Sequence, residues 1–467
     1  MTKHSITKNT NNENNDSEVV NTPNPIINRK ILPLLLSMSI PPMISMLIQS
    51  LYNIIDSIFV AQISQEALTA VSIAFPLQNL VLSFAVGLGV AVNANIAINM
   101  GAGNIEKADR YVGQGIFLTV IHALIFVFIG LFGLKPFFSI FTESAEVMNY
   151  AIQYGLIVIT LSIGMLLHIL FEKIFQANGN MMIPMFLQGF GAITNIILDP
   201  IFIFGLFGFP AMGVKGAAIA TIIGQFSAAL LSIILFIKKS PIKIKKHHFK
   251  PNKKLIFDLY KIALPSGMMM SMPSILTSII NGILASVSQA SIAFFGIYYK
   301  LQTFVNMPVT GMIQGMRPIV SYNYGAGLQK RVLGTIKTAL SFSAVMLIGG
   351  TVLFCAIPEQ LLLMFNASND LLRMGIPGLR ILSLGFAFSF IGITMSGVFE
   401  ALGKGLFSLI ISIVRQLIIV VPLSIIFIKI IGLNGVWITF PIAEFIAAIM
   451  AIILYKKIIS NKTGNTQ

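Results

Sequence analysis

The amino-acid sequence predicts an all-α membrane protein with twelve transmembrane helices in two six-helix lobes, related by a pseudo-two-fold axis along the membrane normal. Three observations support this fold class. The 467-residue chain is 56% hydrophobic and only 10% charged, far outside the range of soluble domains. Twelve apolar runs are each long enough to cross a hydrocarbon core of roughly 30 Å. The second half of the chain also repeats the first without a gap through several runs.

The repeat fixes the relation between the two halves. The matching positions, all at the offset that takes Pro41 to Pro265, include Gln78 and Gln302, Gly101-Ala102-Gly103 and Gly325-Ala326-Gly327, and Ala177 and Ala401. Because each half contains an even number of spans, both halves enter the membrane in the same orientation. Repetition on this scale in a very apolar chain is typical of a membrane transporter.

The expected spans follow one another with short connections. In the first half they are 31–61, 67–100, 111–134, 146–171, 182–208 and 213–237. In the second half they are 258–285, 291–324, 332–357, 371–399, 405–431 and 433–455. The predicted organisation is a disordered cytoplasmic tail (1–29), an N-terminal lobe (30–237), a Lys-rich cytoplasmic linker (238–257), a C-terminal lobe (258–458) and a second cytoplasmic tail (459–467).

The distribution of the basic residues that give the net charge of +15 indicates membrane topology and not nucleic-acid binding. Nine lysines fall between Lys238 and Lys261, and most other basic residues lie on the same side of the predicted membrane. The opposite side has only Lys135, Lys215, Arg373 and Lys429. By the positive-inside rule, both termini of this multi-pass protein are expected in the cytoplasm. The N-terminal tail has no apolar core and does not resemble a signal peptide.

Missing motifs narrow the function. The only cysteine, Cys355, excludes an internal disulfide and a Cys-based metal site. The chain has no G-x-x-x-x-G-K-[ST] motif for ATP, no H-E-x-x-H motif and no soluble catalytic domain. We therefore expect neither an enzyme nor a bound cofactor, and energy must come from an ion gradient.

Polar residues inside the spans need an explanation, because an acidic residue at mid-membrane costs roughly 2.5 to 3.5 kcal/mol on insertion scales. On the first span Gln49, Tyr52, Asn53 and Asp56 share one helix face, at i, i+3, i+4 and i+7. The fifth span adds Gln188, Asn195 and Asp199, and the sixth adds Thr221 and Gln225. Together these residues predict a polar chamber in the first lobe.

Two chemistries are open for Asp56 and Asp199. A carboxyl group shielded in the chamber can exchange a proton as the chamber opens and closes. The same oxygens, with Asn195, Thr221 and backbone carbonyls, can instead surround Na⁺, and no other metal is expected. The structural alternative is that both acids only hydrogen-bond neighbouring helices. Gln78 on the second span and Met269, in an adaptable methionine cluster on the seventh, complete the predicted substrate contacts.

The second lobe does not repeat this chemistry. Asp56 corresponds to Ile280 and Asp199 to Leu423, while Glu444 has no acidic counterpart. The second half instead carries Lys300, Arg317, Arg380 and Arg415 along with Glu444. We expect Glu444 to form a structural charge pair with an arginine, and we name Arg415 as its partner.

The motifs Tyr52-Asn53-x-x-Asp56, Asn195-x-x-x-Asp199-Pro200 and Ala220-Thr221, with the repeated Gly-Ala-Gly loops, resemble the multidrug and toxic compound extrusion (MATE) family. The chain looks most like its MepA-like bacterial branch, from about residue 30 to residue 458. The resemblance implies a multidrug efflux antiporter that expels small cationic amphipathic drugs in exchange for H⁺ or Na⁺. Its other partners would be membrane lipids and no nucleic acid, and we expect a monomer.

The resemblance also implies site residues. Members of this family form a first-lobe cation site from an Asp on the first span, an Asn/Asp pair on the fifth and a Thr on the sixth, here Asp56, Asn195, Asp199 and Thr221. Some members place further carboxylates on the seventh and tenth spans. This chain has none in 265–285 or 376–399, which places the expected cation site in the first lobe.

One alternative function belongs to the same superfamily. Relatives with this repeat architecture flip lipid-linked saccharides or cell-wall precursors, and they would line the central cavity with several cations. The basic residues of the second lobe keep this alternative open. A scaffold or receptor is a third class, and the buried acids argue against it.

Overall fold

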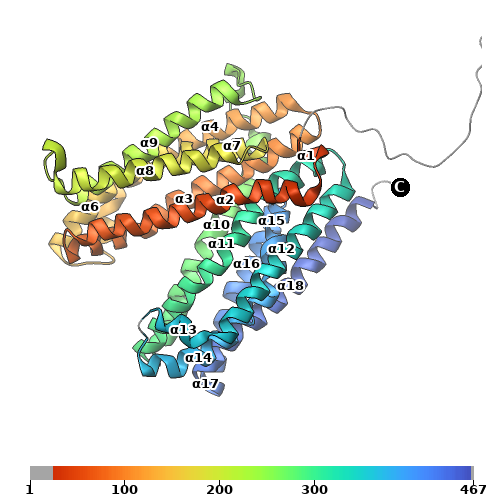
Figure 1. The fold of residues 1–467 in the computed structure, drawn as a ribbon. Coiled ribbons are helices and arrows are strands. Elements are labelled where there is room, and N and C mark those ends of the chain that lie inside the picture. Colours follow the sequence, from red (N-terminus) through yellow and green to blue (C-terminus); the bar gives the residue numbers. More distant parts are fainter. Residues whose placement is uncertain (1–24, 366, 464–467) are drawn as a thin grey trace, which may run out of the picture.

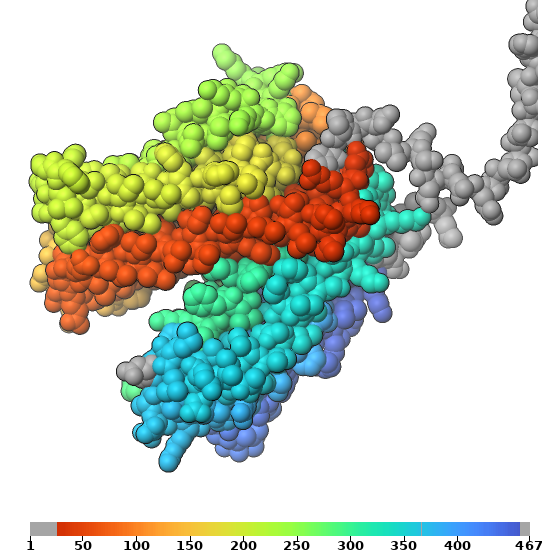
Figure 2. All heavy atoms as spheres, in the orientation of Figure 1, coloured from red at the N-terminus to blue at the C-terminus, as the bar shows by residue number. Residues whose placement is uncertain are grey.

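The computed structural model describes residues 25–365 and 367–463, and in this part of the chain the regular elements are all helices. The helices form two lobes that meet at the end where the described chain termini lie and diverge toward the opposite end (Figure 1). We call these the terminal end and the open end. The space-filling view shows the lobes separated by a gap at the open end (Figure 2).

Each lobe is one repeat. The first lobe contains α1 (Pro25–Asn28), α2 (Ile31–Ala61), α3 (Gln65–Gly101), α4 (Ile105–Phe128), η1 (Ile129–Gly133), α5 (Leu134–Phe138), α6 (Ala145–Thr160), α7 (Ile163–Ala177), α8 (Met182–Phe204), η2 (Leu206–Gly208) and α9 (Val214–Lys239). The second contains α10 (Lys253–Ala285), α11 (Gln289–Gly325), α12 (Gln329–Ala356), α13 (Pro358–Leu363), α14 (Asn369–Ser383), α15 (Phe386–Ala401), α16 (Gly405–Ile413), η4 (Val414–Ile419), α17 (Val420–Ile431) and α18 (Leu433–Thr463). The short helix η3 (Lys246–Phe249) lies in the linker.

The predicted two-lobe fold with twelve spans is confirmed. Nine helices of the described chain are long and apolar enough to cross a membrane, and the bent pairs α6–α7 and α14–α15 bring the number to eleven. The twelfth span is α11, which is 37 residues long but carries Lys300, Arg317 and several amides. The sequence predicts 146–171 and 371–399 as single helices, whereas the structure bends them by 43° and 48° at corresponding places in the two repeats.

The ends of the predicted domains differ slightly from the structure. Pro25–Asn28 forms a helical turn, and the guanidinium of Arg331 donates to the carbonyl oxygens of Ile26 and Arg29. The part of the expected disordered tail next to α2 is therefore ordered, while residues 1–24 lie outside the described chain. At the other end α18 continues to Thr463, beyond the predicted lobe boundary at 458.

The linker is held against α4 by one side-chain amide. Gln114 donates to the carbonyl oxygens of His248 (2.7 Å) and Lys250 (2.8 Å), and its own oxygen accepts from the amide of Asn252. A buried amide that satisfies three backbone groups substitutes for regular secondary structure in this segment. The linker between the lobes is thus fixed to the first lobe before α10 begins.

Small residues let the repeats cross closely at the terminal end. A Cβ atom at Gly101 would lie 2.8 Å from the carbonyl carbon of Tyr322, and one at Gly325 would lie 2.7 Å from that of Ile98. These contacts are equivalent, because the repeat offset takes Gly101 to Gly325 and Ile98 to Tyr322. The pseudo-two-fold axis therefore passes through this crossing of α3 and α11.

The apolar cores follow the same division. One core of buried side chains runs from the second lobe across the terminal end into the first lobe. A second core, which includes Val60, Ala67 and Phe138, fills the open half of the first lobe alone. Close packing of apolar side chains therefore joins the lobes at the terminal end, and no such core joins them at the open end of the described chain.

Candidate functional site

A polar cavity of about 210 Å³ lies inside the first lobe, between α2, α3, α7, α8 and α9. Six of the predicted substrate contacts line it: Gln49, Tyr52, Asn53, Gln78, Gln188 and Gln225. Asn195 and Thr221, from the predicted cation site, also line it. We call this cavity the first-lobe chamber. Met269 on α10 is half-buried and is not among its lining residues, so the structure does not bring this predicted contact to the chamber.

The close packing of α8 on α9 builds one wall of the chamber. Gly191 and Gly224 face each other, and a Cβ atom at Gly224 would lie 2.8 Å from the carbonyl oxygen of Gly191. This approach lets Asn195 on α8 donate to the Thr221 hydroxyl on α9 at 3.4 Å. The same amide donates to Asp199 Oδ1 at 3.2 Å, since the i,i+4 spacing stacks the two residues on one helix face.

The two predicted carboxylates lie together beyond the chamber wall. Asp56 on α2 interacts directly with Asp199 on α8, whose side chain has no exposed surface. Neither carboxylate forms a salt bridge within the described residues, and Asp56 Oδ1 and Asp199 Oδ2 are buried without a hydrogen-bond partner. Buried acceptors of this kind are rare in folded proteins unless a proton or cation completes them.

Neighbouring side chains orient the amides of the chamber. Gln78 donates to the Tyr154 hydroxyl at 3.1 Å, and His168 Nε2 lies 3.3 Å from Gln188 Oε1. Tyr154 and His168 both lie in the predicted span 146–171, and nothing in its local pattern relates them to the polar stripes of the other spans. Only the packing of α6 and α7 places them beside the amides.

Two of the four basic residues named from the sequence in the second lobe, Arg415 and Arg317, form ion pairs. Arg415 Nη1 lies 3.2 Å from both carboxylate oxygens of Glu444, so the expected pair is present. Arg317 forms an ion pair with the buried Glu400, which also accepts from Ser266 at 2.7 Å. Sequence reasoning missed Glu400 because it lies just beyond the predicted span 371–399.

The other two of the four basic residues named from the sequence, Lys300 and Arg380, are exposed, and Arg380 donates to the carbonyl oxygen of Cys355. Two of the four basic residues are thus neutralised and two lie at exposed positions. The described residues therefore do not form a ring of unpaired cations in the second lobe.

Lys173 occupies a position that the sequence did not predict. The predicted span 146–171 ends before Lys173, whereas Lys173 lies inside α7 and is buried. Its ammonium group donates to Glu172 (2.9 Å), Gln176 (3.1 Å) and Gln314 of α11 (3.1 Å). Lys173 therefore joins the two lobes at the terminal end.

One group of possible metal ligands is present among the described residues, but it lies at the linker. Glu106 Oε1 accepts from the Nε2 atoms of His247 (3.3 Å) and His248 (3.2 Å). His248 Nδ1 accepts from the backbone amide of Lys245, so Nε2 of the neutral ring carries the proton. These contacts clamp the linker to the start of α4.

A helical bundle of two repeated lobes, with a shielded polar chamber in one lobe and a cleft between both, defines a multi-pass membrane transporter. The family model described as MatE matches residues 41–201 and 265–426, one segment in each repeat. The chain belongs to this family, which confirms the resemblance predicted from the motifs of the first, fifth and sixth spans.

Relatives match over nearly the whole chain. The chain is 26% identical over 427 residues to the Multidrug export protein MepA of Staphylococcus haemolyticus, covering 91% of this chain and 93% of the relative. It is 25% identical over 437 residues to the FAD transporter of Shewanella oneidensis, covering 91% and 94%.

Solved structures also align along their full length. A crystal structure of MATE in the bent conformation matches with a TM-score of 0.88 at 25% identity, covering 95% of this chain and 98% of that one. The outward-facing conformation of a multidrug resistance MATE family transporter matches with a TM-score of 0.86, also at 25% identity, covering 94% and 98%.

Proposed function

We propose that the protein is a secondary active multidrug efflux antiporter of a bacterial inner membrane, with both termini in the cytoplasm. It exports small cationic amphipathic compounds in exchange for H⁺ or Na⁺ and works as a monomer. The observation that supports this proposal most strongly is the pair Asp56 and Asp199. Both carboxylates are shielded, lack a cationic partner among the described residues, and adjoin a chamber lined by amides.

Two adjacent carboxylates without a counter-ion favour the uptake of positive charge. At 4 Å two unit charges interact by about 4 kcal/mol at an effective dielectric constant of 20, so close like charges repel strongly unless a cation lies between them or one carboxyl group is protonated. Asn195 and Thr221 supply neutral oxygen atoms beside Asp199. The same cluster can therefore hold a proton or coordinate Na⁺, which prefers hard oxygen ligands.

Alternating access follows from the arrangement of the lobes. With the termini in the cytoplasm, closure at the terminal end and divergence at the open end describe an outward-facing state. A coupling ion that enters at Asp56 and Asp199 tightens α2 against α8 and releases drug from the chamber. Drug binding to the inward-facing state and loss of the ion reverse the change, which couples both ligands through one two-state element.

The lining of the chamber suits varied substrates. Its polar groups are amides, hydroxyls and the imidazole of His168, which can both donate and accept, and Met165, Phe75 and Leu82 supply adaptable or apolar surface. Negative charge lies just behind this lining. A cationic amphipathic molecule can thus place its charge toward the carboxylates and its apolar part against α3. The printed name of the staphylococcal relative, a multidrug export protein, is consistent with this proposal.

Transport by everted membrane vesicles tests the proposal. We expect ethidium uptake to follow an imposed pH gradient or an imposed Na⁺ gradient, but not ATP. Asp56→Asn and Asp199→Asn should abolish the uptake, and the matched control Asp370→Asn should not, because Asp370 is an exposed carboxylate on α14. Gradient-independent uptake, or full uptake by Asp199→Asn at equal expression, would contradict the coupling role of the pair.

The same vesicles discriminate against the lipid-linked saccharide flippase. A flippase would give no ethidium uptake under either gradient, and its deletion would cause an envelope defect. We expect the opposite result: resistance to ethidium-like cations without an envelope defect.

A further inference from the structure

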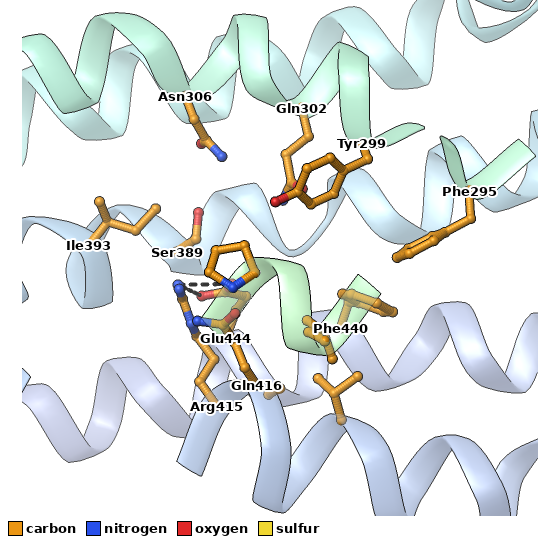
Figure 3. Close-up of a pocket in the computed structure, with 14 residues that line it drawn as sticks. Phe295, Tyr299, Gln302, Asn306, Ser389, Ile393, Arg415, Gln416, Phe440 and Glu444 are labelled. Atoms are coloured by element: carbon orange, nitrogen blue, oxygen red, sulfur yellow. Dashed lines mark hydrogen bonds and ion pairs between the residues drawn. The ribbon is translucent and has the colours of Figure 1, made fainter. Parts of the chain in front are cut away.

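The second lobe has a cavity of its own, of about 140 Å³, that the proposed coupling mechanism does not use (Figure 3). It is enclosed by α10, α11, α15, η4 and α18. We call it the second-lobe cavity. In Figure 3, Gln302 and Asn306 of α11 point toward it from one side, and Arg415 and Glu444 lie opposite them.

The charge in this cavity is balanced, unlike the charge in the first lobe. Arg415 and Glu444 neutralise each other at 3.2 Å, and no other ionisable lining residue except Tyr299 is present. The first-lobe carboxylates have no such partner among the described residues. The second-lobe cavity therefore has no electrostatic reason to select a cation.

Several polar groups of the cavity are not satisfied by the protein. Arg415 Nε and Asn306 Oδ1 are buried without a hydrogen-bond partner. The described residues also provide no hydrogen-bond partner for the side-chain amides of Gln302 and Gln416. The buried acceptor Asn306 Oδ1 and the buried donor Arg415 Nε, which lie on opposite walls, favour a ligand or water that both donates and accepts, because a buried polar group left unpaired is costly.

A local irregularity of the helix positions two of these groups. Arg415 and Gln416 lie in η4, a π-helical turn that interrupts the span from α16 to α17. π-Helical turns are rare and occur frequently at functional sites, since they rotate the following side chains relative to a regular helix. The other wall is apolar and aromatic: the rings of Phe295 and Phe440 have centroids 5.8 Å apart.

A third cavity shares lining residues with both the second-lobe cavity and the first-lobe chamber. This third cavity, of about 250 Å³, lies between α2 and α11. It shares Tyr299, Gln302 and Asn306 with the second-lobe cavity, and Gln49 and Asn53 with the first-lobe chamber. One elongated molecule can therefore reach both lobes.

We infer that the second-lobe cavity is a substrate subsite that binds the uncharged, planar, amide-bearing ring of a substrate whose cationic end lies in the first-lobe chamber. The ring edge, with its N–H and C=O groups, pairs with Gln302, Gln416 and the Arg415–Glu444 pair, and its face packs on the aromatic wall. A cavity of about 150 Å³ holds one benzene ring, so the subsite accepts about one ring of the substrate. This inference rests on the proposed function, because it requires a cationic substrate.

Two probes that differ only at the ring test the inference. The first is a quaternary ammonium group joined by a six-carbon chain to uracil, and the second is the same chain ending in phenyl. Binding of each is measured by titration calorimetry on the purified full-length protein. We expect the wild type to bind the uracil probe at least tenfold more tightly than the phenyl probe, which corresponds to about one hydrogen bond.

Four variants locate the residues that discriminate between the two probes. Gln416→Leu, and independently Gln302→Leu, should lower the affinity for the uracil probe about tenfold and leave the affinity for the phenyl probe unchanged. The reason is that leucine keeps the volume of the side chain and removes its amide. The matched control Gln360→Leu should leave both affinities unchanged, since Gln360 is exposed on α13. Asp199→Asn should weaken both probes equally through the shared cationic end.

The outcomes separate the two proposals. If the wild type binds both probes equally, or if Gln416→Leu and Gln302→Leu change both affinities alike, the subsite is wrong while a cationic substrate remains supported. If the wild type binds neither probe, the cationic substrate class is wrong and the subsite falls with it. The comparison of probes on the wild type does not depend on whether any variant folds.

Discussion

The crossing of α3 and α11 at Gly325 gives a quantitative prediction about conformational change. An alanine at this position would place Cβ 2.7 Å from the carbonyl carbon of Ile98, whereas non-bonded carbon atoms are optimally 3.5–4.0 Å apart. The two helices must therefore separate by roughly 1 Å at the terminal end. Because this contact joins the lobes, we expect Gly325→Ala to disfavour the conformation that is closed there.

The size of the effect follows from overpacking. Added methyl groups in a well-packed contact cost typically about 1–3 kcal/mol. If the contact exists only in the closed conformation, this cost shifts the two-state equilibrium by about 5- to 150-fold. If the population of the closed conformation in the wild type exceeds that of the other conformation by less than this factor, the closed conformation would become the minor one in the variant.

The measurement uses spin labels on both lobes at the terminal end. Labels are attached at Lys107→Cys and Gln329→Cys in a background in which Cys355 is replaced by alanine, and their distance distribution is recorded. The wild type should give mainly a short distance, and Gly325→Ala should add a longer one. Gly349→Ala is the matched control, because nothing lies within 4 Å of a Cβ atom at Gly349. An unchanged distribution in Gly325→Ala would refute the assignment of this crossing as a state-dependent contact.

Three further predictions concern single contacts. Gly224→Ala should separate α8 from α9, break the contact of Asn195 with α9, and lower ion-coupled uptake by at least tenfold while the protein still inserts, as assayed in vesicles at equal expression. Glu400→Gln should leave the Arg317 guanidinium without a counter-charge and destabilise the second lobe by about 3–5 kcal/mol; an unchanged melting temperature in detergent would contradict this. Gln114→Ala should release the linker from α4 and increase its proteolysis severalfold, without changing the affinity for a first-lobe ligand.

The fold could be predicted because its signals are local and repeated. The apolar runs, the offset from Pro41 to Pro265 and the even number of spans per repeat do not depend on how the helices pack. Likewise, the stripe from Gln49 to Asp56 lies on one helix face by periodicity alone. For this reason the polar residues of the first lobe appear together in the structure as the sequence predicted.

Long-range contacts could not be predicted in this way. Three contacts join residues far apart in the chain: Lys173 with Gln314, Arg317 with Glu400, and the close approach of Gly325 to Ile98. Nothing in the local sequence distinguishes Lys173 from a basic residue at a helix end. The shared lining of the three cavities depends likewise on the angle between the lobes.

The sequence by itself determined that this protein is a membrane-spanning repeat with two acidic residues on polar helix faces, since hydropathy and helical periodicity act within one segment. The tertiary structure decided which charges are neutralised, which end of the molecule is closed and which polar groups remain unpaired. These properties depend on distances between helices, and those distances are set by packing across both repeats.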